Sequence, residues 1–247
     1  MSKVTAIIPA RSGSKSIPKK NMIDICGFPL IAYSIAAAKL SNKVDEIIVS
    51  TDGDELAEIS LKYGADVPFL RPLEISGDSS TDIEFVYHYL NYLQGRDKSL
   101  PELIVHLRPT SPLRRISVID DAVKFMQNES DFTALRSMHD THLTPYKMFK
   151  ISDEGIAEPF LRKDGIYESY NLPRQRFEQA FIPNGYVDVI RSEVVINTGT
   201  LHGMRIKVWP TEHVADIDVV EDVRHADHML RNKDRWSEIL EYLERVS

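Results

Sequence analysis

The sequence predicts an α/β fold with a doubly wound, mostly parallel sheet and a β-rich insertion. Uniformly apolar runs alternate with segments of helical periodicity, and the connections between them are short. This alternation stops after Ser137 and resumes late in the chain. We therefore expect one domain over residues 1–247, with an inserted segment at about 139–191.

The predicted strands are uniformly apolar, which is typical of strands buried on both faces of a parallel sheet. They are VTAIIPA, EIIVSTD and ELIVHLRP, at residues 4–10, 46–52 and 102–109. GYVDVI, at 185–190, is expected to be a return strand after the insertion.

The predicted helices show apolar residues at helical spacing and recognisable ends. Pro29 stands near the start of the first, and Gly64 follows the end of the second. The expected helices span 29–40, 54–64, 80–95, 116–127, 219–231 and 234–246. The region from about His139 to Arg191 is instead rich in Tyr, Phe, Pro and Gly, and we expect an extended β segment there.

The composition limits the classes of function. A formal net charge of −7 disfavours non-specific nucleic-acid binding, which requires Lys and Arg to neutralise phosphates. The apolar runs are too short to span a bilayer, and no leader pattern precedes the first strand. The single cysteine, Cys26, suits a reducing cytosol. We expect a cytoplasmic protein that binds neither nucleic acid nor membrane.

The segment AIIPARSGSKSIPKKN, at residues 6–21, predicts a site for a small anion. Its loop carries four basic residues, Arg11, Lys15, Lys19 and Lys20, and Gly13 is expected to allow a tight turn. Neither G-x-x-x-x-G-K-[ST] nor G-x-G-x-x-G is present, so side chains must neutralise the anion. A triphosphate or a departing pyrophosphate fits such a loop. A solvated basic turn is the alternative.

Two other segments are expected at the same edge of the sheet. STDGDE and RPTSPLRR follow the second and third predicted strands, and ligands bind beyond the carboxyl ends of parallel strands. His106, inside the third strand, is interpreted as a packed core residue.

An acidic segment, ADIDVVED, lies late in the chain. In extended backbone, Asp216 and Asp218 share one face while Ile217 points inward. Two carboxylates on one face suit Mg²⁺, which usually takes one or two carboxylates together with substrate phosphates. Acids favoured by a helix N-terminus are the alternative.

Six segments, in order, resemble the motifs of the CMP-sialic acid synthetase family, the acylneuraminate cytidylyltransferases. They are IIPARSGSKSIPKKN, STD, FLRPLE, RPTSPLR, IPNGYVDV and DIDVVED, within a resemblance that runs from residue 3 to about 230. The resemblance implies an Mg²⁺-dependent nucleotidyltransferase, in which a sugar oxygen attacks the α-phosphorus of CTP and pyrophosphate leaves. It also implies a Rossmann-like domain whose β insertion forms a homodimer.

The resemblance also implies a role for particular residues. Catalytic roles fall on Arg11, Lys20 and Asp216. Nucleotide-binding roles fall on Arg11, Ser14, Lys15, Lys20, Asn21, Arg71, Thr110 and Ser111. Sugar-binding roles fall on Arg108, Asn184 and Gly185, and metal-binding roles fall on Asp216 and Asp218.

Three residues depart from the family's pattern. Ser16 stands where the signature usually has glycine, Arg108 where sialic acid enzymes usually carry glutamine, and Ile182 where some carry arginine. A guanidinium such as that of Arg108 suits a sugar carboxylate or a sugar phosphate equally.

The predicted acceptor is an acidic nine-carbon sugar of the sialic, legionaminic or pseudaminic kind. A sugar 1-phosphate, giving a product such as a GDP-hexosamine, is the close alternative. A glycosyltransferase with a D-x-D metal site fits less well, because the two acids lie late in the chain. The presence of both Asp216 and Asp218 argues against a non-catalytic nucleotide-binding module.

Overall fold

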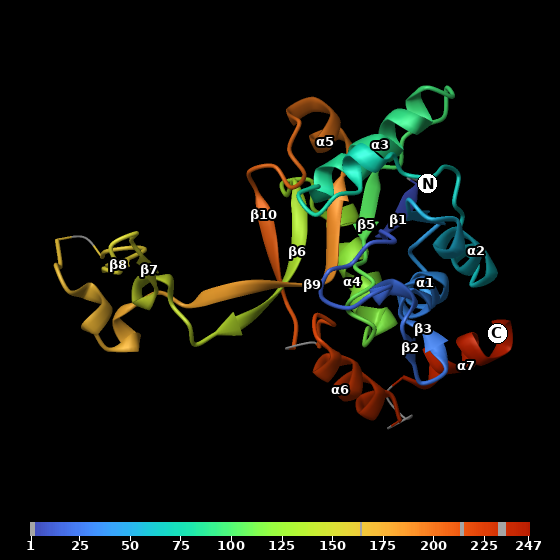
Figure 1. Ribbon diagram of the computed structural model, residues 1–247. Helices are drawn as coiled ribbons and strands as arrows, with labels where there is room; N and C mark the ends of the chain where they lie inside the picture. The colour runs from blue at the N-terminus through green and yellow to red at the C-terminus, as the bar shows by residue number, and fades with distance from the viewer. Residues whose placement is uncertain (1–2, 164, 213–214, 232–235) are drawn as a thin grey trace.

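The computed structural model describes residues 3–163, 165–212, 215–231 and 236–247. Its centre is a six-stranded sheet with the strand order β10-β6-β9-β5-β1-β4 (Figure 1). The strands are β1 (Val4–Pro9), β4 (Glu46–Ser50), β5 (Leu103–His106), β6 (Ala134–Thr141), β9 (Ala180–Arg191) and β10 (Ile206–Pro210). Two short strands, β2 (Asp24–Ile25) and β3 (Phe28–Pro29), pair with each other outside this sheet.

The sheet is mostly parallel, which confirms the prediction. β1 pairs in parallel with β4 and β5, and β10 pairs in parallel with β6. The return strand β9 runs antiparallel between β5 and β6. Its register places Asp188 opposite His106 on β5 and opposite Arg136 on β6. Directly opposed residues share one face of a sheet, so these three side chains are neighbours.

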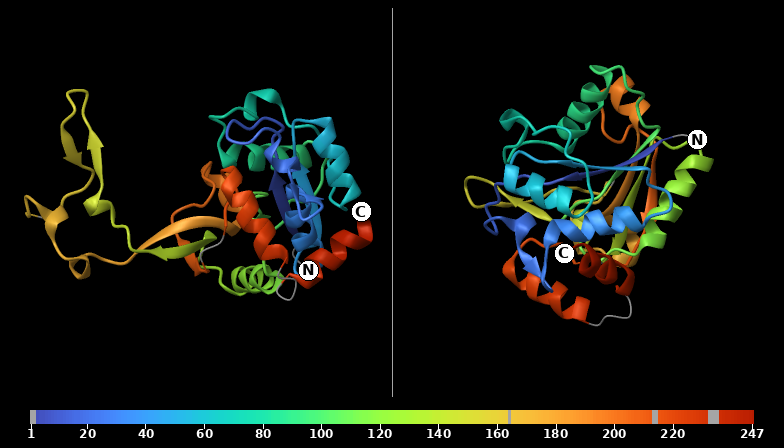
Figure 2. Two further views of the ribbon diagram at one scale, coloured as in Figure 1. Left: turned by 60° about the horizontal axis from the view of Figure 1, so that its bottom comes forward. Right: turned by 90° about the vertical axis from the view of Figure 1, so that its right-hand side faces the viewer.

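Helices cover both faces of the sheet, as a doubly wound fold requires (Figures 1 and 2). One core cluster packs α1, α4 and α7 on one face, and a second packs α3 and α5 on the other. The helices are α1 (Leu30–Leu40), α2 (Asp54–Lys62), α3 (Asp82–Gln94), α4 (Ile116–Asn128), α5 (Ser192–Thr198), α6 (Val220–Arg231) and α7 (Ser237–Val246). No helix among the described residues has the length and apolar character needed to cross a membrane.

The six predicted helices are present, with ends that differ by a few residues. The expected start of the last helix, at 234–235, lies outside the described residues. Five of the strands and α-helices, β2, β3, β6, α5 and β10, are not predicted by the sequence, although the outer end of β6 falls within the expected β segment. α5 has only seven residues, and β10 is an edge strand without buried positions, so neither carries a clear periodic apolar signal.

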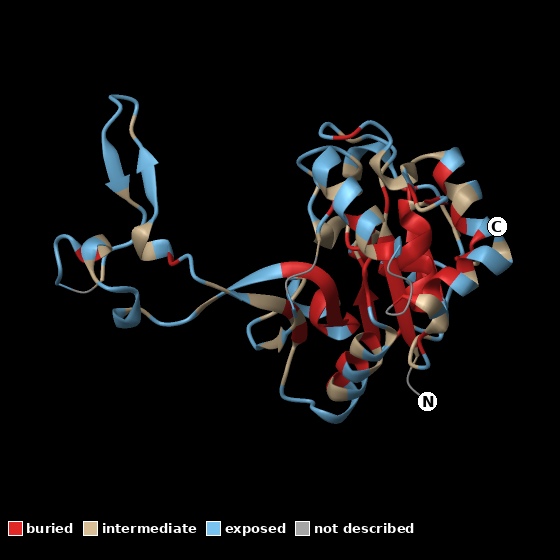
Figure 3. Cartoon of the chain, turned by 90° about the horizontal axis from the view of Figure 1, so that it is seen from below, coloured by how far each residue is buried: buried red, intermediate tan, exposed pale blue. Residues whose placement is uncertain are grey.

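The inserted region forms an arm that projects from the body of the protein (Figures 1 and 2). Its root is an antiparallel ribbon in which β6 and β9 continue beyond the sheet, to the pair Thr141 and Ala180. Its far end holds the hairpin of β7 (Phe149–Ile151) and β8 (Ala157–Pro159). Most of the arm is exposed (Figure 3). The predicted insertion is therefore extended, although residues 184–191 belong to the central sheet.

Candidate functional site

The opening loop, residues 10–21, is tied to the end of the neighbouring strand. The Ser12 backbone N–H donates to Asp52 Oδ1 at 2.7 Å, and the Ser12 hydroxyl donates to Asp52 Oδ2 at 2.9 Å. Asn21 Nδ2 donates to the Arg11 carbonyl at 3.0 Å, which closes the loop on itself. Asp52 belongs to the segment STD, so two of the predicted strand-end segments do meet.

The expectation that Gly13 provides a tight turn in this loop is wrong. Gly13 lies outside any turn, and a Cβ at this position would meet no atom within 4 Å. The turn falls at Pro18 and Lys19, where Lys19 has the left-handed φ of 53°. Ser16 does not have a left-handed backbone, so a residue other than glycine is accommodated there.

A cavity of about 490 Å³, here called the first cavity, opens beside this loop. The predicted site residues that line it are Arg11, Ser14, Lys15, Lys20, Asn21, Arg71, Arg108 and Thr110. Five of these are Arg or Lys, so the cavity concentrates positive charge in an otherwise acidic chain. Ser111, also predicted to bind nucleotide, is fully buried and is not part of this lining.

Asp78 occupies the space between two of these cations. Its Oδ1 accepts from Arg11 Nη1 at 2.5 Å, and its Oδ2 meets Lys15 Nζ at 2.5 Å. Hydrogen bonds from Lys15 and Arg11 hold the pKa of Asp78 below its ordinary value. The sequence analysis does not identify Asp78, although it follows the FLRPLE motif by only a few residues. The carboxylate stands where two phosphate oxygens of a ligand could sit.

Lys20 joins the loop to the acidic segment. Its Nζ donates to the Ile217 carbonyl and to Asp218 Oδ1, both at 2.9 Å. Ile217 is fully buried, and its N–H donates to the Thr110 carbonyl at 2.8 Å. Asp216 and Asp218, on either side, are exposed, which confirms the predicted alternation. The predicted metal-binding pair thus lies next to Lys20 and Thr110, which line the first cavity.

The carboxyl groups of this pair fit a cation. Asp216 is exposed on one side only: desolvation by the surrounding protein raises its pKa above the ordinary value and the nearby Asp218 charge raises it further, although a hydrogen bond from Thr110 opposes the shift. Two neighbouring carboxylates that repel each other are stabilised by any cation placed between them. Lys20 supplies part of that charge, and hard oxygen ligands suit Mg²⁺.

A second cavity, of about 510 Å³, opens beside the acidic segment. Asp216 and Asn184 both line it, together with residues such as Arg115, Ile182, Tyr186 and Trp236. The amide of Asn184 is held in place because its Nδ2 donates to Thr211 Oγ1 at 2.6 Å. Apolar side chains and a few polar groups share this lining, which is typical of a pocket for a substituted small molecule.

Arg108 and Gly185, both predicted to bind sugar, meet each other in this structure. Arg108 lines the first cavity, and Gly185 has a φ of +66° with its Cα against the Arg108 side chain. A Cβ at Gly185 would lie 2.9 Å from Arg108 Cδ, so only glycine leaves room for the guanidinium stem.

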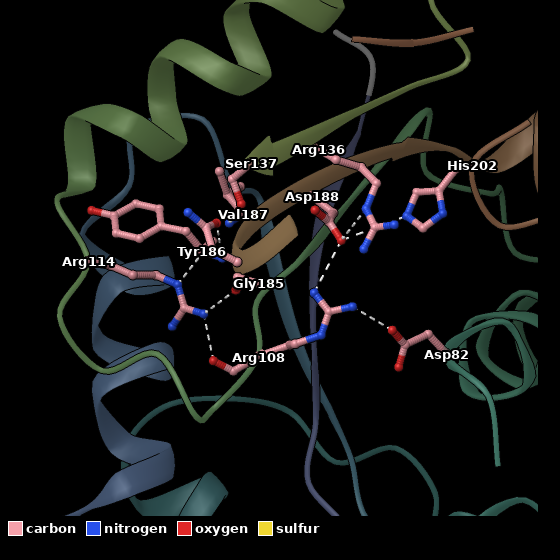
Figure 4. A network of polar contacts seen from close by, with 11 residues as sticks. Asp82, Arg108, Arg114, Arg136, Ser137, Gly185, Tyr186, Val187, Asp188 and His202 are labelled. Atoms are coloured by element: carbon pink, nitrogen blue, oxygen red, sulfur yellow. Dashed lines mark hydrogen bonds and ion pairs between the residues drawn. The ribbon is translucent and has the colours of Figure 1, made fainter. Parts of the chain in front are cut away.

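The Arg108 guanidinium is held by two carboxylates (Figure 4). Nη2 donates to Asp82 Oδ2 at 2.6 Å, and Nη1 donates to Asp188 Oδ2 at 3.2 Å. Arg136 Nε and His202 Nε2 face the same Asp188 oxygen at 3.4 and 3.7 Å. Burial alone would raise the pKa of Asp188, but the nearby His202 ring and the Arg108 charge hold it well below its ordinary value.

His106 lies next to this network and is fully buried, which agrees with its interpretation as a core residue. Its ring packs edge-on against Phe85, with centroids 5.2 Å apart. Burial lowers the pKa of His106 to about 3, and the Arg108 charge acts in the same direction. The ring is therefore neutral at neutral pH.

Arg114, a residue within RPTSPLR, has a structural role that the sequence does not predict. Its side chain is only 1% exposed, and no carboxylate contacts it among the interactions described. Its guanidinium donates to the carbonyls of Tyr186 (2.6 Å), Ser111 (2.5 Å), Arg108 (2.6 Å) and Gly185 (3.1 Å), and to Ser34 Oγ (2.7 Å). Arg114 thereby joins the loop after β5 to α1 and to β9.

Burial lowers the pKa of Arg114 to about 10, so the guanidinium stays charged at neutral pH. A buried charge is stable only when its donors are satisfied, and here carbonyl dipoles do this. The segment RPTSPLR contains two arginines, Arg108 and Arg114, and the sequence does not show which of them is buried.

Comparisons with known proteins concern the chain as a whole. A family model described as cytidylyltransferase matches residues 5–223. The chain is 43% identical over 235 residues to a pseudaminic acid cytidylyltransferase of Campylobacter jejuni, covering 89% of this chain and 93% of the relative. It is 30% identical over 217 residues to an N-acylneuraminate cytidylyltransferase of Escherichia coli, covering 88% of this chain and 49% of that protein.

Solved structures show the same fold. CMP:2-keto-3-deoxy-manno-octonic acid synthetase, determined in complex with CTP, superposes with a TM-score of 0.68 at 15% sequence identity. The superposition covers 94% of this chain and all of that one. At this identity the likeness concerns the α/β architecture alone.

We predict that Arg114→Met lowers the free energy of unfolding by at least about 3 kcal/mol, because several buried acceptors lose their donor together. Chemical denaturation monitored by circular dichroism measures the change. Arg115→Met is the matched control, since the Arg115 side chain is 46% exposed and its loss should change stability by less than about 0.5 kcal/mol. Equal effects of the two substitutions would contradict the role of Arg114.

Proposed function

The chain belongs to the cytidylyltransferase family, and from that premise we propose that it transfers CMP from CTP to an acidic nine-carbon sugar, releasing pyrophosphate. The observation that carries the proposal is that one acidic segment contacts the first cavity and lines the second. Lys20, a cation of the first cavity, pairs with Asp218, and Asp216 lines the second cavity. The named relatives that match over most of this chain act on acidic sugars, which favours this acceptor over a sugar 1-phosphate.

The first cavity is suited to the nucleotide. Arg11, Lys15 and Lys20 present cations at one end, where they neutralise the phosphate oxygens and the charge that grows on pyrophosphate as it leaves. Arg71 is buried at 7% exposure, and its backbone N–H is fixed by the Thr51 carbonyl at 2.6 Å. These groups bind and orient the nucleotide, so most of the catalysis is positioning and charge neutralisation.

The second cavity is suited to the acceptor. Asn184 offers an oriented amide, and the apolar side chains of Ile182, Met229 and Trp236 can cover acyl groups of a substituted sugar. An acceptor oxygen placed beside Asp216 faces the first cavity, where it can attack the α-phosphorus opposite the leaving pyrophosphate. The bond between the α-phosphorus and the oxygen that links it to the β-phosphate breaks as the bond between the α-phosphorus and the acceptor oxygen forms.

We also propose that Asp216 and Asp218 hold Mg²⁺ when the nucleotide is bound. The raised pKa of Asp216 marks a position where added positive charge is favourable. The ion would supply neutralisation of phosphate charge and help to orient the nucleotide. Lys20 already bridges to Asp218 and stabilises that carboxylate in the protein without ligand.

We expect pyrophosphate release when the protein is mixed with CTP, an acidic nine-carbon sugar and Mg²⁺, and a coupled phosphate assay measures it. Excess EDTA should abolish turnover. Asp218→Ala should lower kcat by more than about a hundredfold, because the metal site loses one of two carboxylates. The circular dichroism spectrum of this variant should be unchanged, since Asp218 is exposed.

The same assay, run with the four nucleoside triphosphates and with sugar 1-phosphates, tests the alternatives. Turnover confined to sugar 1-phosphates would refute the proposed acceptor. Full activity of Asp218→Ala, or activity that survives EDTA, would refute the metal assignment.

Asp78→Asn should lower the Kd for CTP by about two- to fivefold, because the triphosphate no longer displaces a carboxylate from Arg11 and Lys15. The gain should shrink at high salt, which screens exposed pairs. Titration calorimetry with CTP at two salt concentrations measures both effects. A weaker affinity for CTP would instead mean that Asp78 serves to orient the two cations.

We further propose that the arm mediates a homodimer. Supporting this, the arm exposes large apolar side chains, which is unfavourable for an isolated surface in water. They include Leu143, Ile151, Ile156, Phe160, Leu161 and Tyr167.

The double substitution Ile151→Lys and Phe160→Lys should therefore weaken or abolish the dimer, as measured by sedimentation velocity. Met204→Lys is the matched control, because Met204 is 95% exposed on the body of the protein rather than on the arm. A monomeric wild-type protein, or a double variant that dimerises as wild type does, would contradict the proposal.

A further inference from the structure

The half-buried network around Arg108 connects the walls of the two cavities. Asp82 begins α3 and lines the first cavity. Asp188 belongs to β9, the strand that also supplies Asn184 and Tyr186 to the second cavity. Arg108 contacts both carboxylates, so its side chain spans the distance between α3 and β9 (Figure 4).

The charges within this network are already balanced. The guanidinium groups of Arg108 and Arg136 face the carboxylates of Asp82 and Asp188, and His106 beside them is neutral. Burial alone would lower the pKa of Arg108, but Asp188 and Asp82 raise it above its ordinary value. An arginine with two carboxylate partners has little net charge to offer a substrate anion, unlike Lys15, which is paired only at the exposed surface.

The geometry of Arg108 is fixed from every side. Its carbonyl accepts from Arg114 Nη2 at 2.6 Å and from Ser34 Oγ at 3.2 Å. Its side-chain stem lies against Gly185, where the backbone leaves no space for a Cβ. The guanidinium is therefore held in one orientation before any substrate arrives.

We propose that Asp188, Arg108 and Asp82 form a brace that sets the distance and angle between the two cavities, with Asp188 and Asp82 as positioning residues. In this role Arg108 aligns the two substrates and is not itself the receptor for the acceptor's carboxylate. The proposal rests on the proposed CMP transfer, because it concerns the alignment of the attacking oxygen with the α-phosphorus. Misplacement by about 1 Å costs a reaction of this kind about a hundredfold in rate.

The brace predicts a distinctive kinetic result for Arg108→Gln and Asp82→Asn. Each should lower kcat by about ten- to a hundredfold while the KM values for CTP and for the acceptor stay within about threefold, because each cavity still binds its own substrate. The double variant should be no slower than Arg108→Gln alone, since both substitutions break the same link. Steady-state kinetics with each substrate varied separately measure these effects.

The choice of variants separates the kinetic effect from a loss of folding stability. Asp188→Asn should reproduce the kinetic effect, but it removes a fully buried carboxylate that faces two half-buried guanidinium groups and can destabilise the fold. The Asp82 side chain is 40% exposed, so Asp82→Asn tests the brace without that cost. Arg205→Gln is the matched control: Arg205 pairs with Asp131 at 3.5 Å on the exposed surface, and wild-type kinetics are expected.

Three outcomes would overturn the brace. A rise of tenfold or more in acceptor KM for Arg108→Gln, with kcat preserved, would make Arg108 an acceptor ligand. The same rise in the KM for CTP would make it a nucleotide ligand. Wild-type kinetics of Asp82→Asn would show that the link is unimportant.

A readout without turnover separates this proposal from the proposed function. Hydrogen exchange of the backbone amides at the start of α3 and at 185–188 should become faster in Arg108→Gln and Asp82→Asn but not in Arg205→Gln. Inactivity of the wild-type protein with CTP and acidic sugars would refute the proposed function while leaving this exchange result intact. Unchanged exchange at both segments would refute the brace.

Discussion

The organisation of the site depends on one buried guanidinium, that of Arg114. It donates to oxygens from three parts of the chain that are far apart in sequence: α1, the loop after β5, and the start of the buried half of β9. Each of these hydrogen bonds contributes only a small net free energy. Replacement of the guanidinium would nevertheless leave several buried carbonyls without a donor. The loop that carries Arg108 and Thr110 is rigid for this reason, and so is the border between the two cavities.

The second constraint is that most of the Arg and Lys side chains lining the first cavity are paired with carboxylates. Asp78 meets Arg11 and Lys15, Asp218 meets Lys20, and a pair of carboxylates holds Arg108. The carboxylates of Asp78 and Asp218 are exposed, so their pairs with the cations are weak and can be exchanged for phosphate. Asp188 is fully buried, so its pair with Arg108 is fixed. Burial of the partner carboxylate thus separates the cations available to a ligand from the one that holds the structure.

The antiparallel strand β9 contributes residues near both cavities. A strand inserted between β5 and β6 brings residues from beyond the arm back to the end of β5. The same strand carries Asn184 toward one cavity and Asp188 beneath the other. The arm and the site are therefore two ends of one continuous ribbon, and a partner bound to the arm would act close to the acceptor.

The sequence by itself determined the alternation of strands and helices, the basic opening loop and the spacing of Asp216 and Asp218, because these follow from local periodicity and chain order. It also placed most of the cavity's cations correctly. Only the tertiary structure decided that Asp78 and Asp188 are their partners, that Gly185 serves Arg108, and that Arg114 is buried. Those contacts join residues up to 80 positions apart, such as Arg108 and Asp188, and pairing of that range depends on strand register and burial, which no local pattern encodes.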